Sequence, residues 1–211
     1  MDGWGCSVEE NRRAWSTGNH DNDDRAINIG VINNSQGPNW TTSEAAVSAT
    51  IDLCVDICIR NGISSLSWVN NGSTQGNMTA HSFFANKACP GPFLMDRMPS
   101  IRDTVNTRLT ESRNQAAGVT AAANRLRDEG VINTPTFWIN NFHAIQFLGG
   151  LIIAMANAPK NATPVTITTV DAAIDRLASR GILNSPQYWR DNQGRLEHLG
   201  ELLIAVARRV P

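Results

Sequence analysis

The sequence predicts a mixed α/β domain followed by an all-α domain that is built from a tandem repeat. Two short segments, Ala26–Ile32 and Ile63–Val69, are rich in alternating or β-branched apolar residues, which is typical of strands. The segment between them has an apolar stripe at helical spacing, and residues 120–211 contain two similar copies of one pattern. We therefore expect an α+β mixed sheet with flanking helices over residues 1–110, a linker over 111–119 and helical repeats over 120–211.

The helix expected between the two strands begins at a capping box formed by Thr41 and Glu44. Gly62 is the expected C-terminal stop. The apolar stripe places Cys54 and Cys58 in the core rather than in a metal-binding pair. Its members follow the positions i, i+4, i+7, i+8 and i+11: Val47, Ile51, Cys54, Val55 and Cys58.

The region after Pro92 is expected to contain one more helix of the first domain, from about Ser100 to Leu109. The stretch Thr110–Gly118 is polar, and we interpret it as the linker to the second domain.

The second domain contains an internal repeat with a period of 51 residues. Arg125-Leu126-x3-Gly130 aligns without gaps with Arg176-Leu177-x3-Gly181, and the match continues to the ends of both copies. We expect each copy, at about 120–158 and 170–209, to contain a helix, a short helix that opens at a proline, and a third helix. Pro159–Pro164 joins the copies.

Trp138 and Trp189 occupy equivalent positions in the two copies. We expect them to form the aromatic core of each repeat. The alternative is that they stack on sugar rings.

Composition excludes several classes of function. Hydrophobic residues make up 41% and charged residues 18% of the chain, which suits a globular protein with a substantial core. The formal net charge of −1 argues against nucleic acid as a partner. No stretch is long and apolar enough to span a membrane, and the N-terminus has no signal-peptide pattern. The four cysteines show no disulfide framework, and the sequence does not reveal the oligomeric state.

The segment from Thr79 to Pro92 combines residues with metal and acyl-transfer chemistry. His81 and Cys89 are eight positions apart, and imidazole and thiolate are the usual ligands of zinc. Lys87 precedes the cysteine by two positions, where its charge can stabilise a reacting oxygen, and Pro-Gly-Pro follows it directly. The alternative from spacing alone is a buried Cys89 at a turn, with His81 hydrogen-bonded nearby and Lys87 solvated.

These motifs resemble the type-two N-acetylmuramoyl-L-alanine amidases, the zinc family that includes peptidoglycan recognition proteins and amidase-type phage endolysins. The resemblance covers about residues 1–109. It is carried by five stretches: Val8–Gly18, Asn22–Ile29, Asp52–Cys58 with Asn61-Gly62-Ile63, Asn77-Met78-Thr79, and His81…Lys87-Ala-Cys89-Pro-Gly-Pro.

The resemblance implies a zinc ion (Zn2+) bound by His81, Cys89 and a further histidine, with Lys87 stabilising the tetrahedral oxyanion. The further histidine belongs to an early strand that precedes the matched residues, so we expect the domain to be incomplete at its N-terminus. His20 lies where the family places no ligand, and His143 and His198 belong to the repeats. Gly30 stands where many members have a catalytic glutamate, which some phage-type members also lack.

The resulting hypothesis is a zinc-dependent peptidoglycan hydrolase that cleaves the amide between N-acetylmuramic acid and L-alanine of the stem peptide. The helical repeats are similar to C-terminal appendages of cell-wall hydrolases, which implies wall binding. The alternative is a non-catalytic wall-binding remnant, or a gene-model fragment of such an enzyme. The expected place of action is the cell wall, reached by release at phage lysis or by another route of export.

Overall fold

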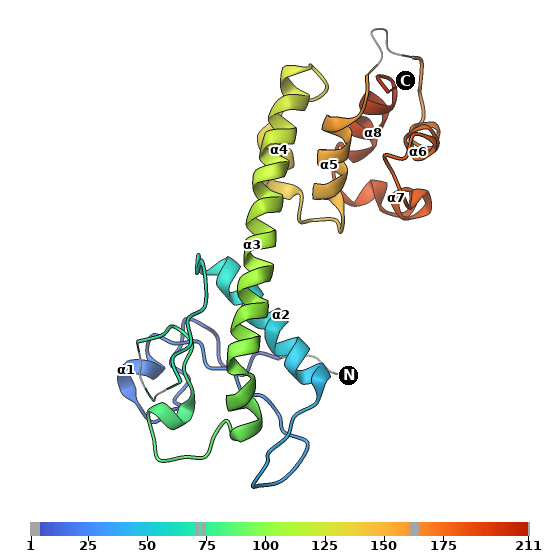
Figure 1. Ribbon diagram of the computed structural model, residues 1–211. Coiled ribbons are helices and arrows are strands. Elements are labelled where there is room, and N and C mark those ends of the chain that lie inside the picture. The colour runs from blue at the N-terminus through green and yellow to red at the C-terminus, as the bar shows by residue number, and fades with distance from the viewer. Residues whose placement is uncertain (1–4, 71, 73–74, 161–164, 211) are drawn as a thin grey trace. The chain divides into compact units, whose positions relative to one another are not determined.

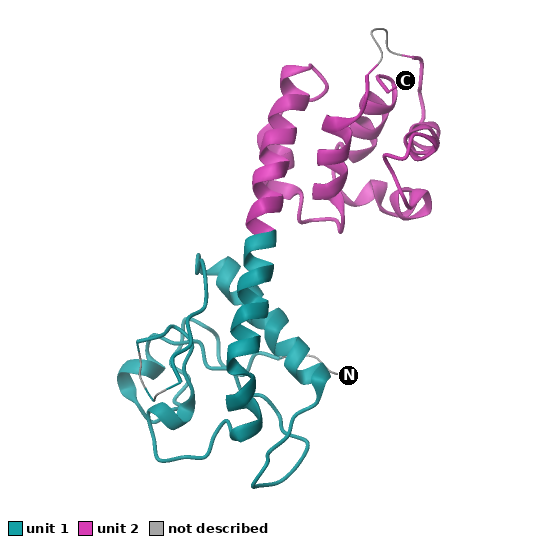
Figure 2. Cartoon of the chain, in the orientation of Figure 1, with its two compact units in different colours: residues 1–111 teal, residues 112–211 magenta. Residues whose placement is uncertain are grey.

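Helices form most of the regular structure of the chain. The computed structural model describes residues 5–70, 72, 75–160 and 165–210. The chain divides into two compact units, Met1–Glu111 and Ser112–Pro211 (Figure 2). The elements, labelled in Figure 1 where there is room, are α1 (His20–Asp23), α2 (Glu44–Arg60), the 3-10 helix η1 (His81–Phe83), α3 (Pro92–Asp128), α4 (Pro135–Asn141), α5 (Leu148–Asn157), α6 (Val170–Ser179), α7 (Pro186–Asn192), η2 (Gln193–Arg195) and α8 (Leu199–Ala207).

The prediction of a mixed α/β sheet in the first unit is wrong. Within the described residues the only β pairing is an isolated parallel bridge between Trp68 and Met78. The segment Ala26–Ile32 has no partner strand, and its Ile29 and Ile32 are exposed. Alternating apolar residues favour an extended backbone, but a strand also needs a neighbour to pair with its N–H and C=O groups.

Side-chain amides take over part of the role that a neighbouring strand would have. Asn106 on α3 accepts a hydrogen bond from the Leu66 N–H at 2.7 Å and donates to the Leu66 C=O at 2.9 Å. Asn77 likewise accepts from the Ser67 N–H at 2.7 Å and donates to the Ser65 C=O at 2.8 Å. The second predicted strand is therefore held in place without a sheet.

The predicted helix between the two segments is confirmed as α2. Its N-cap is Ser43, which accepts from the Ala46 N–H at 3.1 Å, so the predicted capping box at Thr41 is wrong. Gly62 follows the helix with a φ of 66°. The apolar face of α2 packs on the first part of α3, in a cluster whose buried members are Val47, Val55, Cys58, Leu94, Ile101, Val105 and Leu109.

Helix α3 is much longer than the predicted helix from Ser100 to Leu109. It includes residues 111–119, which we expected to be a linker. The polar residues of this stretch include Glu, Arg and Gln, which are good helix formers, so polarity here marks an exposed helical surface rather than a loop. From Val119 onward α3 is part of the apolar core of the second unit.

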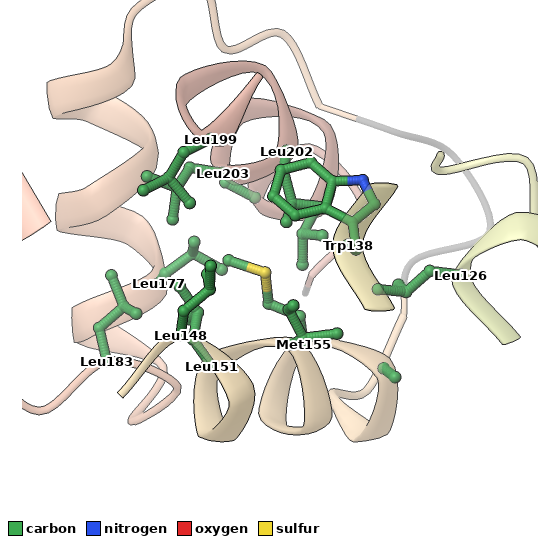
Figure 3. Packing of buried hydrophobic residues seen from close by; sticks show 14 of the residues in the cluster. Leu126, Trp138, Leu148, Leu151, Met155, Leu177, Leu183, Leu199, Leu202 and Leu203 are labelled. Atoms are coloured by element: carbon green, nitrogen blue, oxygen red, sulfur yellow. The ribbon is translucent and has the colours of Figure 1, made fainter. Parts of the chain in front are cut away.

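The second unit has one continuous apolar core to which both copies of the repeat contribute (Figure 3). Leu148, Ile152 and Met155 of α5 are fully buried with Leu177 of α6 and Leu203 of α8. Trp138 and Trp189 retain only 4% and 5% exposure. Their predicted place in the core is confirmed, and the alternative of sugar stacking is wrong for both.

The two copies have the same local structure at the offset of 51 residues, as from Pro135 of α4 to Pro186 of α7. Phe147 and His198, which precede α5 and α8, are both left-handed, with φ of 67° and 63°. In each short helix an asparagine side chain donates to a backbone carbonyl at 2.7 Å, Asn141 to Phe137 and Asn192 to Tyr188. Residues 161–164 of the expected connection Pro159–Pro164 lie outside the described residues.

Replacement of Asn106 tests whether its two hydrogen bonds to the Leu66 backbone take the place of strand pairing. Asn106→Ala leaves both the N–H and the C=O of Leu66 without their partners in a half-buried position, so we expect a loss of about 1–3 kcal/mol in the free energy of unfolding. Thr107→Ala, at the exposed next position of α3, is the matched control and is expected to change stability by less than about 0.5 kcal/mol. Urea denaturation measures both, and equal stability of the two variants would contradict the assignment.

Candidate functional site

The backbone brings the two ends of the His81–Cys89 segment together. His81 opens the 3-10 helix η1, and the N–H of Ser82 donates to the C=O of Cys89 at 3.0 Å. The C=O of His81 accepts from the N–H of Ala85 at 3.2 Å, which closes the turn after η1. Residues 81 and 89 therefore lie on neighbouring segments of the backbone within one loop.

Two aromatic contacts anchor this loop. Trp68, which is 8% exposed, stacks on Phe83 of η1 with ring centroids 5.2 Å apart. On the other side, Gly91 has a φ of 87°, and a Cβ there would meet side-chain atoms of Trp40 at 3.1 and 3.2 Å. Glycine is thus needed just after Cys89 for both its backbone conformation and its close approach to an indole ring.

Exposure differs among the three predicted site residues. His81 is half-buried, whereas Lys87 and Cys89 are exposed. The N–H of Lys87 donates to the C=O of Ala85 at 2.8 Å, so its backbone belongs to the same turn. The predicted alternative of a buried Cys89 does not match this exposure.

The described residues of this loop include two side chains of the kinds that bind zinc, His81 and Cys89, but no group of three. Within that part of the chain no cluster of three or more His, Cys, Asp or Glu side chains could hold a metal ion. An imidazole and a thiol are chemically suited to zinc, which in catalytic sites takes three protein ligands and a water. The donors fit the metal in kind, and their number is one short of a catalytic set.

The other histidines lie in different surroundings. His20, in α1, has its Nδ1 atom 2.9 Å from the Asp24 carboxylate, and its side chain is 68% exposed. His143 and His198 are exposed in the second unit. Gly30 is exposed in the extended segment before α2.

The cysteines of α2 are core residues, as predicted. Cys58 is 1% exposed, and Cys54 packs against the same apolar cluster. Burial, together with the neighbouring Cys58, raises the pKa of the Cys54 thiol to about 11, so this thiol is protonated at neutral pH.

A buried polar cluster, not anticipated from the sequence, shapes the loop from Thr17 to Asp23. Asp23 is 2% exposed and accepts from the hydroxyl of Thr17 at 2.7 Å and from its N–H at 3.1 Å. Burial tends to raise the pKa of Asp23, but hydrogen bonds from Thr17 and the charge of Arg13 outweigh it and hold this pKa below its usual range. The Arg13 guanidinium also lies 3.6 Å from the ring centroid of Trp15, which is 74% exposed.

A bidentate ion pair ties the first residues of this unit to α2. Arg60 donates to the two carboxylate oxygens of Glu10 at 2.7 and 2.9 Å. The hydrogen bonds from Arg60 lower the pKa of Glu10. The stretch that carries the N-terminal part of the family resemblance is thereby attached to the helical core.

Comparison with known proteins gives one family match, and it lies in the first unit. Residues 4–92 match the family model described as N-acetylmuramoyl-L-alanine amidase. The match ends at Pro92, directly after the Lys87–Cys89 loop, and supports membership of this segment in the peptidoglycan amidase family. No curated protein and no solved structure gives a significant match to the chain.

In the described part of the chain, none of the helices has the length and apolar character needed to cross a membrane.

The Thr17–Asp23 cluster predicts a specific dependence of stability on pH. Because folding lowers the pKa of Asp23, its contribution is present above about pH 4 and is lost as the pH falls below that value. Asp23→Asn removes the negative charge and one of the two acceptor oxygens that face Thr17, so we expect a lower melting temperature at pH 7 and a smaller deficit at pH 3.

Asp21→Asn is the control for this experiment, because the Asp21 side chain is 94% exposed in the same short helix. It should melt close to the unmodified chain at both pH values. A deficit of Asp23→Asn that is the same at pH 3 and pH 7 would contradict the assigned charge of Asp23.

Proposed function

We propose that this chain acts as a zinc-dependent peptidoglycan hydrolase that cleaves the amide between N-acetylmuramic acid and the L-alanine of the stem peptide. The observation that carries the proposal is the amidase family match over residues 4–92, which ends on the loop that contains His81, Lys87 and Cys89. The geometry of that loop supports it, because one backbone turn holds an imidazole, an ammonium and a thiol within a few residues.

Each of the three residues has a separate role in this proposal. His81 and Cys89 bind the metal, which supplies Lewis-acid polarisation of the amide carbonyl when it is bound. A third protein ligand is required, and the resemblance assigns it to a histidine on a strand ahead of the matched motifs. Lys87 places its ammonium group beside the oxygen that gains negative charge during the attack on the amide.

The exposure of Lys87 and Cys89 suits a large, insoluble substrate. A glycan strand with stem peptides can reach functional groups only at the protein surface, and both side chains are exposed. The buried carboxylate of Asp23 and the Glu10–Arg60 ion pair stabilise the matched segment and have no part in the proposed chemistry.

A second function is a wall-binding protein without catalysis. It is favoured by one observation, that the described residues bring two donors rather than three to the metal site. A protein with this function would bind peptidoglycan but would not cleave the amide.

Cleavage of purified peptidoglycan by the full chain distinguishes the two functions. We expect release of the α-amino group of L-alanine, loss of this activity with a chelator, and its recovery with zinc. About one zinc per chain should be bound when metal is in excess. Binding of far less zinc, with no release of amino groups, would support the non-catalytic function and contradict the first.

Single substitutions separate the metal ligands from the oxyanion group. His81→Ala and Cys89→Ala should lose both zinc and activity. Lys87→Gln should retain zinc and lose about 10²–10³-fold in kcat, because it removes a charge that acts on the transition state. Asn86→Ala, at the exposed neighbouring position, is the matched control and should keep both. Full activity of Lys87→Gln would rule out its proposed role.

A further inference from the structure

The second unit carries two aromatic pairs, each formed by one residue from either copy of the repeat and each with one exposed and one half-buried ring. Phe137 of α4 contacts His198, with ring centroids 5.6 Å apart, and Tyr188 of α7 contacts Phe147 at 5.7 Å. Tyr188 occupies the position of Phe137, and His198 that of Phe147, at the offset of 51 residues. The short helix of each copy thus reaches the residue before the last helix of the other copy.

One ring of each pair remains accessible, whereas Phe137 and Tyr188 are half-buried against the core. Phe147 is 62% exposed, and the His198 side chain is 52% exposed. The equivalent tryptophans Trp138 and Trp189 lie beneath them in the core, where they contact Phe137 and Tyr188 edge to face. Each exposed ring is therefore supported by a layer of buried aromatic residues.

The backbone of both residues with exposed rings, Phe147 and His198, has an unfavourable conformation. Phe147 and His198 have φ of 67° and 63°, a region that costs residues with a Cβ roughly 1 kcal/mol or more. The Tyr188 hydroxyl donates to the C=O of Gln146 at 2.9 Å and so fixes the turn that presents Phe147. Maintaining a strained backbone at the same position in both copies, to display a ring to solvent, points to a ligand for that ring.

Polar groups surround one of the two pairs. The Nδ1 atom of His198 lies 2.8 Å from the carboxylate of Glu201, and Nε2 lies 3.4 Å from that of Glu197. A sugar ring presents an apolar C–H face and an edge of hydroxyl and amide groups. An aromatic ring beside hydrogen-bonding side chains is complementary to both parts.

The charge of this unit also suits an anionic wall polymer. Residues 112–211 contain ten Lys and Arg and seven Asp and Glu, whereas residues 1–111 contain eight and twelve. Peptidoglycan carries carboxylates on its stem peptides. A net positive charge on the second unit and a net negative charge on the first favour approach of the wall to the second unit.

We propose that the Phe137–His198 and Tyr188–Phe147 pairs are twin subsites for the amino-sugar glycan of peptidoglycan, each taking one sugar ring against its exposed aromatic face. Two equivalent subsites suit a ligand that is itself a repeating polymer, because the second contact is made at a high effective concentration once the first has formed. The choice of peptidoglycan as the ligand rests on the proposed function of the first unit.

Co-sedimentation of the full chain with purified, insoluble peptidoglycan tests the twin subsites. A chelator is present throughout, so that hydrolysis does not remove the ligand. Phe147→Asn and His198→Asn each delete one ring, and asparagine tolerates the left-handed backbone better than most residues. We expect each variant to weaken binding about fivefold to tenfold. The double variant should weaken it by at least the product of the two.

Ile32→Asn is the matched control, because it removes an apolar side chain that is 85% exposed in the first unit. It should bind as the unmodified chain does. The melting temperatures of Phe147→Asn and His198→Asn should be unchanged or higher, which separates loss of a ligand contact from loss of fold.

Two outcomes would overturn the inference. One is a double variant that binds peptidoglycan as tightly as the unmodified chain. The aromatic pairs would then serve only to pack the two copies of the repeat together. The other is self-association of the unmodified chain in light scattering that Phe147→Asn abolishes without any effect on wall binding, which would make a second copy the occupant.

Amide cleavage by the unmodified chain is measured separately, on a soluble muramoyl-L-alanine compound. Wall binding that depends on Phe147 and His198 in a chain that cleaves nothing supports the twin subsites and counts against the proposed hydrolase. Cleavage of the soluble compound, together with wall binding that Phe147→Asn and His198→Asn leave unchanged, would support the hydrolase and contradict the twin subsites.

Discussion

Burial of apolar residues along α3 is the interaction on which both units depend. In the first unit, Ile101, Val105 and Leu109 of this helix pack against the apolar stripe of α2. In the second, Val119, Ala123 and Leu126 belong to the large core that the repeats share. Removing such side chains from water is the main favourable contribution to folding, and here one helix provides it to two separate cores. The candidate site lies on the loop that ends where α3 begins.

The candidate site is defined by its backbone more than by contacts between its side chains. The Ser82–Cys89 hydrogen bond, the stacking of Trp68 on Phe83 and the close approach of Gly91 to Trp40 hold the loop in one conformation. Lys87 and Cys89 then project from a fixed turn into solvent. Contacts of the backbone and of the aromatic rings, rather than contacts among His81, Lys87 and Cys89, therefore define the shape of this loop.

The second unit shows how a duplicated sequence becomes one folded body. Neither copy can bury its apolar residues alone, so helices of both contribute to a single core. The crossed contacts of Phe137 with His198 and of Tyr188 with Phe147 place equivalent residues of each copy on the other. Duplication therefore produces two similar surfaces on one unit, which is the basis of the proposed avidity.

The sequence by itself determined the elements whose signals are local. The period of α2, the helix-opening prolines and the core positions of Trp138 and Trp189 could be predicted because each depends on residues close together in the chain. The offset of 51 residues could be predicted because two segments of the sequence resemble each other. The candidate site was predicted from the sequence because His81, Lys87 and Cys89 lie within nine positions of one another, and its chemistry stays a prediction.

Only the tertiary structure decided the remaining features, because they depend on residues far apart in the chain. The alternation in Ala26–Ile32 predicted a strand, but strand formation requires a partner, and the described residues provide none for it. Asn106 reaches Leu66 across 40 positions, and Asp23 is buried by a fold that its polar surroundings do not suggest. Local pattern sets the preferred conformation of a segment, whereas pairing and burial are set by what the rest of the chain places beside it.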